Sequence, residues 1–235
     1  MLTTMQEMLI LLEDEKKVPL YRLNRWGRPA RGALAKLKNL NLAQKLKVDN
    51  EDFYEINSKG EKYFDDVLEV LQSSKKWDNK WRLVMFDIPE TQRSTRDKLR
   101  RSLTNLGMGI LQGSVWISPI DLKDKVMKIS ERLNLGSSLR YFEVLSTNTL
   151  DKKIISKAWN LPEINLQLDK FIKKANHDLK GMGKGNGDRY KAKKLIFEYS
   201  LIIKKDPKLP LEFIEKNELR KDAREIYLKL RKYAN

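Results

Sequence analysis

The fold is decided by residues 81–119, "WRLVMFDIPETQRSTRDKLRRSLTNLGMGILQGSVWISP". An apolar run opens this stretch and ends at Asp87, which predicts a buried strand. A helix over about 90–106 should follow, because leucines recur there at helical spacing. Two short strands, separated near Gln112 and Gly113, complete the stretch. We therefore expect strand, helix, strand and strand in this order.

Two further elements extend this order on the C-terminal side. Residues 122–133 read as a helix, and "LRYFEVLS" (139–146) reads as a strand. Strand, helix, strand, strand, helix, strand is the split βαβ or ferredoxin-like plan. Because the sheet in this plan keeps open edges, such a domain often dimerises. The sequence thus predicts a ferredoxin-like dimerisation domain over 77–148.

The N-terminal segment has a different pattern. Helices are expected over 3–14, 20–24 and 29–40, followed by two strands around a turn at 49–51 and a helix capped by Ser58. Three helices followed by a two-stranded hairpin is the order of a winged helix, a common DNA-binding module. A short polar linker, 73–76, separates this segment from the central domain.

The remaining residues predict a helical C-terminal domain. Helices are expected around 154–159, 163–176, 190–205 and 223–233. The loop 180–188 contains alternate glycines, but it lacks the spacing of a phosphate-binding loop, so we interpret it as a mobile connection. The expected class is α+β, with domains at 1–74, 77–148 and 151–235.

Basic residues lead into the third N-terminal helix. Arginines stand at three-residue intervals, and two lysines follow on the helix: Arg22, Arg25, Arg28, Arg31, Lys36 and Lys38. Arginine holds phosphate and reads guanine bidentately, so this group is the predicted interface for double-stranded DNA. The alternative is a helical domain that binds a protein. The acidic hairpin tip around Asp49 disfavours a wing lying deep in a groove.

Composition limits the classes of function. The chain has 235 residues and a formal charge of +16, which favours polyanionic partners. Its lack of cysteine excludes thiolate catalysis and thiolate-bound zinc, and its one histidine, His177, disfavours paired-histidine metal sites. No apolar run is long enough to span a membrane and no signal peptide is recognisable. We expect a cytoplasmic protein that does not act on membranes.

Asp87 raises a question of metal binding. An acid at the end of a buried strand can hold Mg or Mn for phosphodiester hydrolysis, but such sites commonly need a second carboxylate, and no convergent one is evident. A symmetric dimer could bring two copies of Asp87 together. Alternatively, Asp87 accepts backbone N–H groups at the strand-to-helix turn. On the following helix, Arg93, Arg96 and Arg100 form a basic stripe that could contact nucleic acid or a partner chain.

These motifs resemble a known family. Three central stretches, "WRLVMFDIPE" (81–90), "LRRSLTNLGMG" (99–109) and "SVWISP" (114–119), together with "KKDPKLPLEFI" (204–214), are similar to PaaX-type bacterial transcriptional repressors. The resemblance implies a winged helix, a dimer and, for the best-known members, an acyl-CoA effector. No stretch of the sequence identifies a pocket for that effector.

The central segment also resembles the small CRISPR adaptation endonuclease, the second Cas protein. Asp87, Arg93, Arg96 and "QGSVW" (112–116) match that pattern, with Trp116 in the place of a phenylalanine. This second resemblance implies a metal-binding role for Asp87. The sequence therefore predicts a non-enzymatic, dimeric DNA-binding repressor of a palindromic operator, released by a small effector. A metal-dependent nuclease or CRISPR-adaptation component is the alternative.

Overall fold

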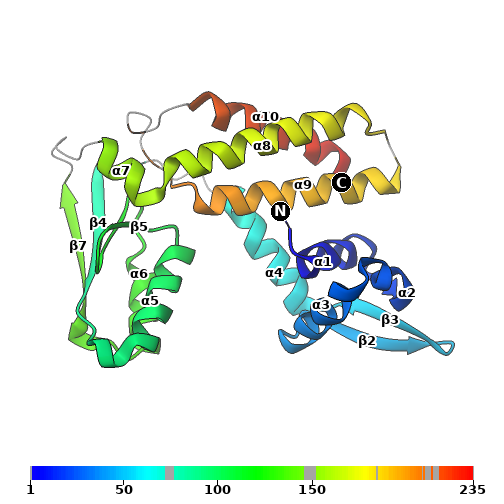
Figure 1. Ribbon diagram of the computed structural model, residues 1–235, viewed down its shortest axis with the longest axis horizontal. Coiled ribbons are helices and arrows are strands. Elements are labelled where there is room, and N and C mark those ends of the chain that lie inside the picture. The colour runs from blue at the N-terminus through cyan, green and yellow to red at the C-terminus, as the bar shows by residue number, and fades with distance from the viewer. Residues whose placement is uncertain are drawn as a thin grey trace. The chain divides into compact units, whose positions relative to one another are not determined.

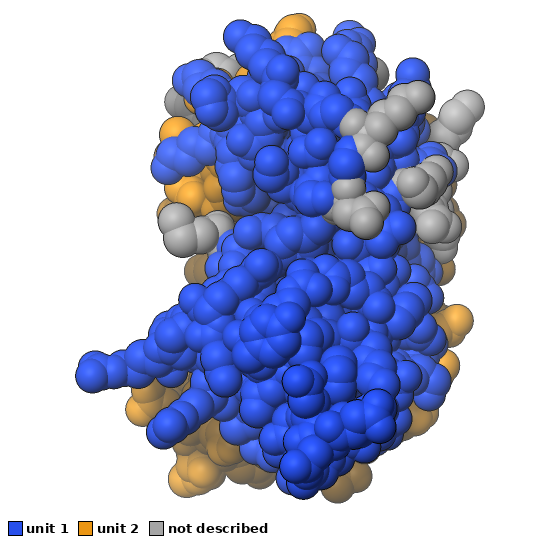
Figure 2. Space-filling model, turned by 90° about the vertical axis from the view of Figure 1, so that its right-hand side faces the viewer, with its two compact units in different colours: residues 1–73, 170–201, 221–235 blue, residues 74–169, 202–220 orange. Residues whose placement is uncertain are grey.

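The computed structural model describes residues 2–71, 77–145, 152–183, 185–207, 209, 213 and 217–234. The chain forms two compact units (Figure 2). Unit 1 comprises residues 1–73, 170–201 and 221–235, and unit 2 comprises residues 74–169 and 202–220. Helices and antiparallel sheets occur in both, which confirms the α+β class. The predicted linker at 73–76 lies outside the described residues.

The N-terminal module of unit 1, residues 2–71, has the predicted element order plus one short strand. Its elements are α1 (Thr4–Glu15), β1 (Lys17–Pro19), α2 (Leu20–Leu23), a 3₁₀ turn (Asn24–Trp26), α3 (Arg28–Asn39), β2 (Ala43–Val48), β3 (Glu51–Ile56), α4 (Ser58–Leu68) and a closing 3₁₀ turn (Glu69–Leu71). The three strands form one sheet in the order β1-β3-β2. Strand β1 is too short to be recognised from alternation in the sequence.

Two local details of this module differ from the sequence-based prediction. Asp49 and Asn50 alone form the hairpin turn, both with positive φ, and Glu51 already pairs with Val48. The predicted cap of α4 by Ser58 is wrong. Asn57 is the N-cap, because its extended backbone lets its side chain accept the Gly60 N–H at 3.0 Å.

Three long helices dominate the C-terminal half: α8 (Leu161–Lys180), α9 (Asn186–Lys205) and α10 (Asn217–Ala234). Within unit 1 they pack through aromatic rings. Phe171 stacks on Tyr199 at 5.1 Å between ring centroids, and Tyr199 lies 5.6 Å from Tyr227. The glycine-rich connection is shorter than predicted because α9 begins at Asn186.

The same helices join the N-terminal module rather than standing alone. Residues 170–201 and 221–235 group with residues 1–73 into unit 1. Lys194 of α9 lies 2.6 Å from Glu7 of α1, and Arg189 lies 2.7 Å from the buried carboxylate of Asp14. The division into three consecutive domains stays a prediction. Each of the two compact units is formed by segments that are separated in the sequence.

Unit 2 contains the predicted split βαβ order. Its elements are β4 (Lys80–Phe86), a 3₁₀ turn (Glu90–Gln92), α5 (Arg93–Asn105), β5 (Gly109–Gln112), β6 (Val115–Ser118), α6 (Lys123–Arg132), a second 3₁₀ turn (Gly136–Ser138), β7 (Leu139–Leu145) and α7 (Lys152–Trp159). The sheet order is β5-β6-β4-β7, and every neighbouring pair is antiparallel. Figure 1 shows α5 and α6 on the same side of this sheet.

Alternation along β4 divides the core of unit 2 between the two faces of the sheet. Val84 and Phe86 pack with Leu99 and Leu103 of α5 under the helices. On the opposite face, the Trp81 ring lies 6.4 Å from that of Trp159, at the end of α7. The Trp159 indole N–H also donates to the Gly107 carbonyl at 2.8 Å. Helix α7 therefore covers part of the face that α5 and α6 leave open.

An ion pair anchors the described part of the C-terminal signature. Arg220 of α10 makes two hydrogen bonds to the Asp206 carboxylate, at 2.7 and 2.8 Å, and a third to Asn165 at 3.0 Å. Burial raises the pKa of Asp206 more than these hydrogen bonds lower it. Of the motif 204–214, residues 208, 210–212 and 214 lie outside the described part of the chain.

Candidate nucleic-acid interface

Helix α3 has one buried side and one basic side. Ala30, Ala33, Leu34 and Leu37 point into the core of unit 1. The predicted basic residues of the helix are all exposed: Arg28, Arg31, Lys36 and Lys38. Two small residues, Gly32 and Ala35, lie exposed between them. The exposed side of the helix is thus positively charged, and its middle carries only small side chains.

The start of α3 is well suited to an anion. Gly27 is its N-cap, with φ of 63°, and provides no side-chain cap for the first amides of the helix. Asn24, Gly27, Arg28 and Arg31 line a hollow of about 330 Å³. Pro29 has no N–H, and the Ala30 N–H donates to the Gly27 carbonyl at 3.0 Å, so the donors for an anion here are mainly the two guanidinium groups. The helix dipole adds to their attraction for negative charge at this end. Neither Arg28 nor Arg31 forms an ion pair with another described residue.

The other two arginines of the predicted group are engaged within the protein. Arg22 makes a two-pronged pair with the Glu15 carboxylate, one hydrogen bond being 2.8 Å long, and this pair raises the pKa of Arg22. Arg25 lies over the Trp26 ring, 4.3 Å from its centroid, and 5.9 Å from that of Tyr190. The structure therefore separates Arg28 and Arg31, which are open to a ligand, from Arg22 and Arg25, which support the turn.

Residues that the sequence did not indicate fix this turn. The Trp26 indole donates to Glu7 at 2.7 Å, and the Tyr190 hydroxyl donates to the Glu7 carbonyl at 3.2 Å. Burial raises the pKa of the Glu7 carboxyl, but hydrogen bonds from Lys194 and Trp26 outweigh burial and lower it below its usual value. Burial raises the pKa of Tyr190 to about 12, so its hydroxyl stays protonated as a donor. No local pattern signals these contacts, because Glu7 and Tyr190 lie far apart in the sequence.

The hairpin contributes less positive charge than α3. Near its tip, Lys45 pairs with Asp52 at 2.7 Å, and Asp49 and Glu51 are exposed. Carboxylates are poor phosphate contacts, so α3 and the turn before it carry the basic surface of this module.

Asp87 is exposed just beyond β4, and its backbone N–H donates to the Ser138 carbonyl at 2.8 Å. Among the described residues, no backbone N–H donates to the Asp87 carboxylate at the strand-to-helix turn, so the structure does not show the hydrogen bonds predicted there. Pro89 and Gln92 precede the two helical starts, and neither start has a side-chain cap. Within the described ranges no cluster of three or more acidic or histidine residues could hold a metal ion. A metal site shared between two chains stays a prediction.

The second predicted basic stripe lies on α5 in unit 2. Arg93 is exposed, and Arg100 is half-buried. Arg96 is drawn toward Glu90 by a 3.3 Å ion pair. At such an exposed site the pair contributes little to stability, so Arg96 can exchange it for another anion.

Unit 2 also has an apolar surface. Met85, Phe142 and Val144 are 43, 42 and 42% exposed. They share one sheet face, because Leu83 pairs with Phe142 and Trp81 with Val144, two residues apart on each strand. This face is the one opposite α5 and α6. We refer to these three residues as the open sheet patch.

Comparisons with known proteins agree with these observations. Residues 74–155 match the family described as the PaaX protein central Cas2-like domain. The resemblance predicted for the central segment is thus confirmed. The structure is similar to that of the uncharacterized protein Rv0674 from Mycobacterium tuberculosis, with a TM-score of 0.52 and 15% sequence identity over 88% of this chain and 83% of that chain. At this identity the likeness concerns the fold alone.

No curated protein matches the chain at a significant level. In the described part of the chain, no helix is both long enough and apolar enough to cross a membrane.

Proposed function

We propose that this chain, whose residues 74–155 carry a PaaX-type central domain, is a DNA-binding transcriptional regulator. The observation that carries the proposal is the open pair Arg28 and Arg31 at the uncapped start of α3. The N-terminal module supplies the element order of a winged helix around this pair. The partner we propose is double-stranded DNA.

In this proposal α3 enters the major groove. Its small exposed residues, Gly32 and Ala35, allow the backbone to approach the base edges. Arg28 and Arg31 contact phosphate or guanine at one end of the helix, while Lys36 and Lys38 contact the flanking backbone. Arg22 and Arg25 act indirectly, because they hold the turn in place through Glu15 and Trp26.

The test compares two double variants in binding to DNA from upstream of the chain's own gene, measured by gel shift and anisotropy. Arg28→Gln with Arg31→Gln should weaken binding at least tenfold and reduce the salt slope by about two, one for each lost phosphate contact. Lys59→Gln with Lys62→Gln removes the same charge from α4 and should change affinity less than threefold. Equal losses in both variants would reduce the effect to net charge and refute the assigned surface.

We also propose that the regulator is a homodimer reading a palindromic operator, with the open sheet patch as the contact between copies. Contiguous exposed apolar residues commonly mark such contacts. Light scattering should give twice the 27.7 kDa of one chain. Phe142→Glu should halve this mass, whereas Leu228→Glu, at an equally exposed site on α10, should not. A wild-type protein that is monomeric at micromolar concentration would contradict the dimer.

The second candidate function, a metal-dependent nuclease, is favoured by the position of Asp87 at the strand end of a Cas2-like domain. Incubation of the same DNA with Mg or Mn distinguishes the two. Retarded but intact DNA supports the regulator, which is not an enzyme. Cleavage that requires metal and disappears in Asp87→Ala would instead establish the nuclease.

Release from DNA by a small effector, for which an acyl-CoA is one candidate, is part of the regulator proposal.

A further inference from the structure

A hollow between the ends of α8 and α10 is lined by three lysines. It has a volume of about 610 Å³ and lies within unit 1. Each helix contributes one face to it, with residues at positions i, i+3 and i+4. The lining residues are Asn176, Leu179 and Lys180 of α8, and Lys229, Lys232 and Tyr233 of α10. We refer to these six residues as the lysine groove.

The charge of the lysine groove is not balanced locally. All three lysines are exposed, and none of them forms an ion pair with another described residue. Asp178 and Glu225 are the acids nearest to these lysines in the sequence, and neither lines the groove. Residues 226–235 contain three Lys or Arg and no Asp or Glu. Such a local concentration of positive charge attracts polyanions.

The helix ends explain part of this charge. A lysine in the last turn of a helix interacts favourably with the negative end of the helix dipole, and Lys180 and Lys232 lie in such turns. Lys229 lies one turn earlier, where this effect has faded. Tyr233 adds a hydroxyl group and Asn176 an amide group, and both can donate to a phosphate oxygen. The helix dipoles alone therefore do not account for the groove.

The chemistry of the lysine groove suits a row of phosphates. A lysine ammonium is a strongly hydrated point charge, and it lacks the planar fork by which arginine holds a carboxylate or reads guanine. Leu179 is the one aliphatic side chain among the described lining residues. The groove thus offers little apolar surface to the body of an organic ligand. A sugar–phosphate backbone needs charge and hydrogen-bond donors rather than apolar surface.

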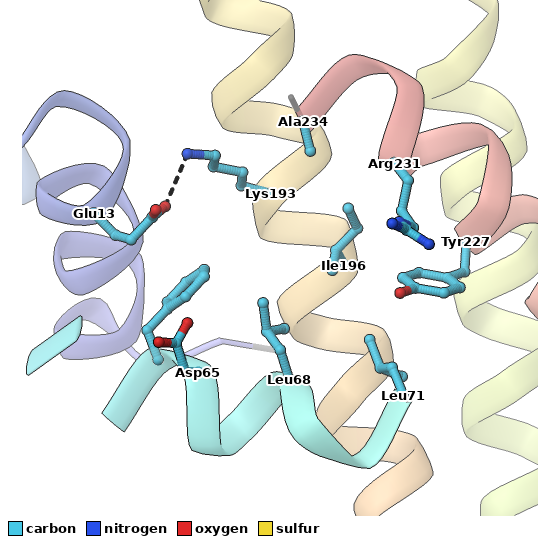
Figure 3. A pocket seen from close by; sticks show the side chains of 10 residues that line it. Glu13, Asp65, Leu68, Leu71, Lys193, Ile196, Tyr227, Arg231 and Ala234 are labelled. Atoms are coloured by element: carbon cyan, nitrogen blue, oxygen red, sulfur yellow. Dashed lines mark hydrogen bonds and ion pairs between the residues drawn. The ribbon is translucent and has the colours of Figure 1, made fainter. Parts of the chain in front are cut away.

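The lysine groove lies beside the beginning of α9. Helix α9 starts soon after α8 ends, and the two helices run antiparallel (Figure 1). Helix α10 also runs antiparallel to α9. The Tyr227 ring lies 5.6 Å from that of Tyr199, and one turn later Arg231 lines a cavity together with Lys193 (Figure 3). The last turns of α8 and α10 are therefore both next to the first turns of α9.

The beginning of α9 also supports the turn before α3. The centroid of the Tyr190 ring lies 5.9 Å from the Arg25 guanidinium. Lys193 is about 5 Å further along α9, because a helix rises about 1.5 Å per residue. Packed helix axes are about 8–10 Å apart, so the groove lies about 20–30 Å from Arg25. At about 3.4 Å per base pair, a duplex covers this separation in about six to nine base pairs.

We infer that the lysine groove binds the backbone of the DNA segment that flanks the site of α3. Lys180, Lys229 and Lys232 contact phosphates, and Tyr233 and Asn176 donate hydrogen bonds to them. Because such contacts do not read bases, the groove adds affinity and lengthens the bound segment without changing the preferred sequence. The inference rests on the proposed DNA-binding function, to which it adds a second and separate surface.

The test varies the length of the duplex. The short duplex is the shortest fragment that keeps specific binding, and the long duplex extends it by about ten base pairs, one helical turn, on each side. Lys229→Gln with Lys232→Gln should weaken binding to the long duplex at least fivefold. The salt slope for that duplex should fall by about two, one for each lost phosphate contact. Binding to the short duplex should change less than twofold.

Two controls accompany this comparison. Lys59→Gln with Lys62→Gln removes the same charge from α4, and its effect on affinity should be the same for both duplexes. Circular dichroism melting checks that every variant is folded.

A second measurement locates the groove on the DNA. The chain has no cysteine, so Asn176→Cys provides a single attachment point for iron–EDTA, which cleaves the DNA near it. Cleavage of the long duplex should fall in the added flanks. The same reagent attached through Lys62→Cys should leave those flanks intact.

Three results would overturn the inference. These are equal losses of affinity for the two duplexes, an unchanged affinity for the long duplex, and cleavage from position 176 confined to the short segment. In each case, weakened binding by Arg28→Gln with Arg31→Gln would leave the proposed function intact. Conversely, a loss confined to the long duplex, with full binding by that arginine variant, would support the groove and refute the surface assigned to α3. A protein that binds neither duplex would refute both proposals.

Discussion

Replacement of Gly60 by alanine tests the close packing of α4 against the backbone at Leu42 in the N-terminal module. Gly60 lies in the first turn of α4, packed against the chain that leaves α3. A Cβ at this position would lie 2.0 Å from the Leu42 carbonyl oxygen and 2.7 Å from the Ile56 side chain. The Asn57 N–H also donates to the same Leu42 oxygen at 3.3 Å, which limits how far that backbone can move.

The expected loss in free energy of unfolding depends on whether the added Cβ meets backbone or a side chain. Overpacking in a core costs about 1–3 kcal/mol, and backbone cannot rotate away as a side chain can, so we expect a loss of about 3 kcal/mol or more for Gly60→Ala. Gly32→Ala is the matched control on α3, where no atom lies within 4 Å of an added Cβ. There alanine should stabilise the helix by about 0.5–1 kcal/mol.

The assay must report on unit 1 alone. Trp26 is the one tryptophan of the five that belongs to unit 1. Its fluorine resonance, after labelling with fluorotryptophan, therefore follows the unfolding of this unit in urea. At about 2–3 kcal/mol per molar urea, Gly60→Ala should lower the midpoint by about 1 M or more, and Gly32→Ala should raise it. A Gly60→Ala midpoint within about 0.2 M of wild type would refute the close contact between α4 and Leu42.

Two further predictions concern unit 2. Hydrogen bonds from the buried Arg82 hold the pKa of Asp78 at about 2, so the stabilisation from this carboxylate is present above its ordinary pKa of 3.8 and is lost as pH falls toward 2. Arg82→Met should raise the pKa of Asp78 toward 3.8 in an NMR titration, with the Lys80 backbone N–H still holding it somewhat below that value, and a pKa still near 2 would contradict the assignment. Gly109→Ala would place a Cβ 2.7 Å from the Trp159 ring and should destabilise unit 2 by about 1–3 kcal/mol in thermal melts. An unchanged melting temperature would show that α7 does not pack on β5.

Local patterns were sufficient to predict the elements. The spacing of Leu34 and Leu37 placed the buried side of α3, and that of Leu99 and Leu103 placed the buried side of α5, as the structure shows. These predictions succeed because burial of one helix face imposes its period directly on the sequence. The basic side of α3 could be predicted for the same reason.

Contacts between distant segments could not be predicted in this way. The engagement of Arg25 depends on Tyr190, and the burial of Asp14 depends on Arg189. Each partner lies more than 160 residues away, and lysines and arginines are so numerous in this chain that no single pairing stands out. The cavity lined by Glu13, Leu68, Lys193 and Arg231 could not be predicted either, because the helices that form it are far apart in the sequence (Figure 3).

The pairing of α1 with α9 has a consequence for how the protein is made. Glu7 and Asp14 leave the ribosome long before Lys194 and Arg189. The ion pairs between α1 and α9 therefore cannot form until residues 74–169 of unit 2 have been synthesised. Domains usually fold in the order of their synthesis. In this chain the segment that carries the candidate DNA-binding helix is translated before unit 2, whereas the helices that complete unit 1 follow most of unit 2. A chain terminated after residue 169 would therefore carry that helix without α9 and α10.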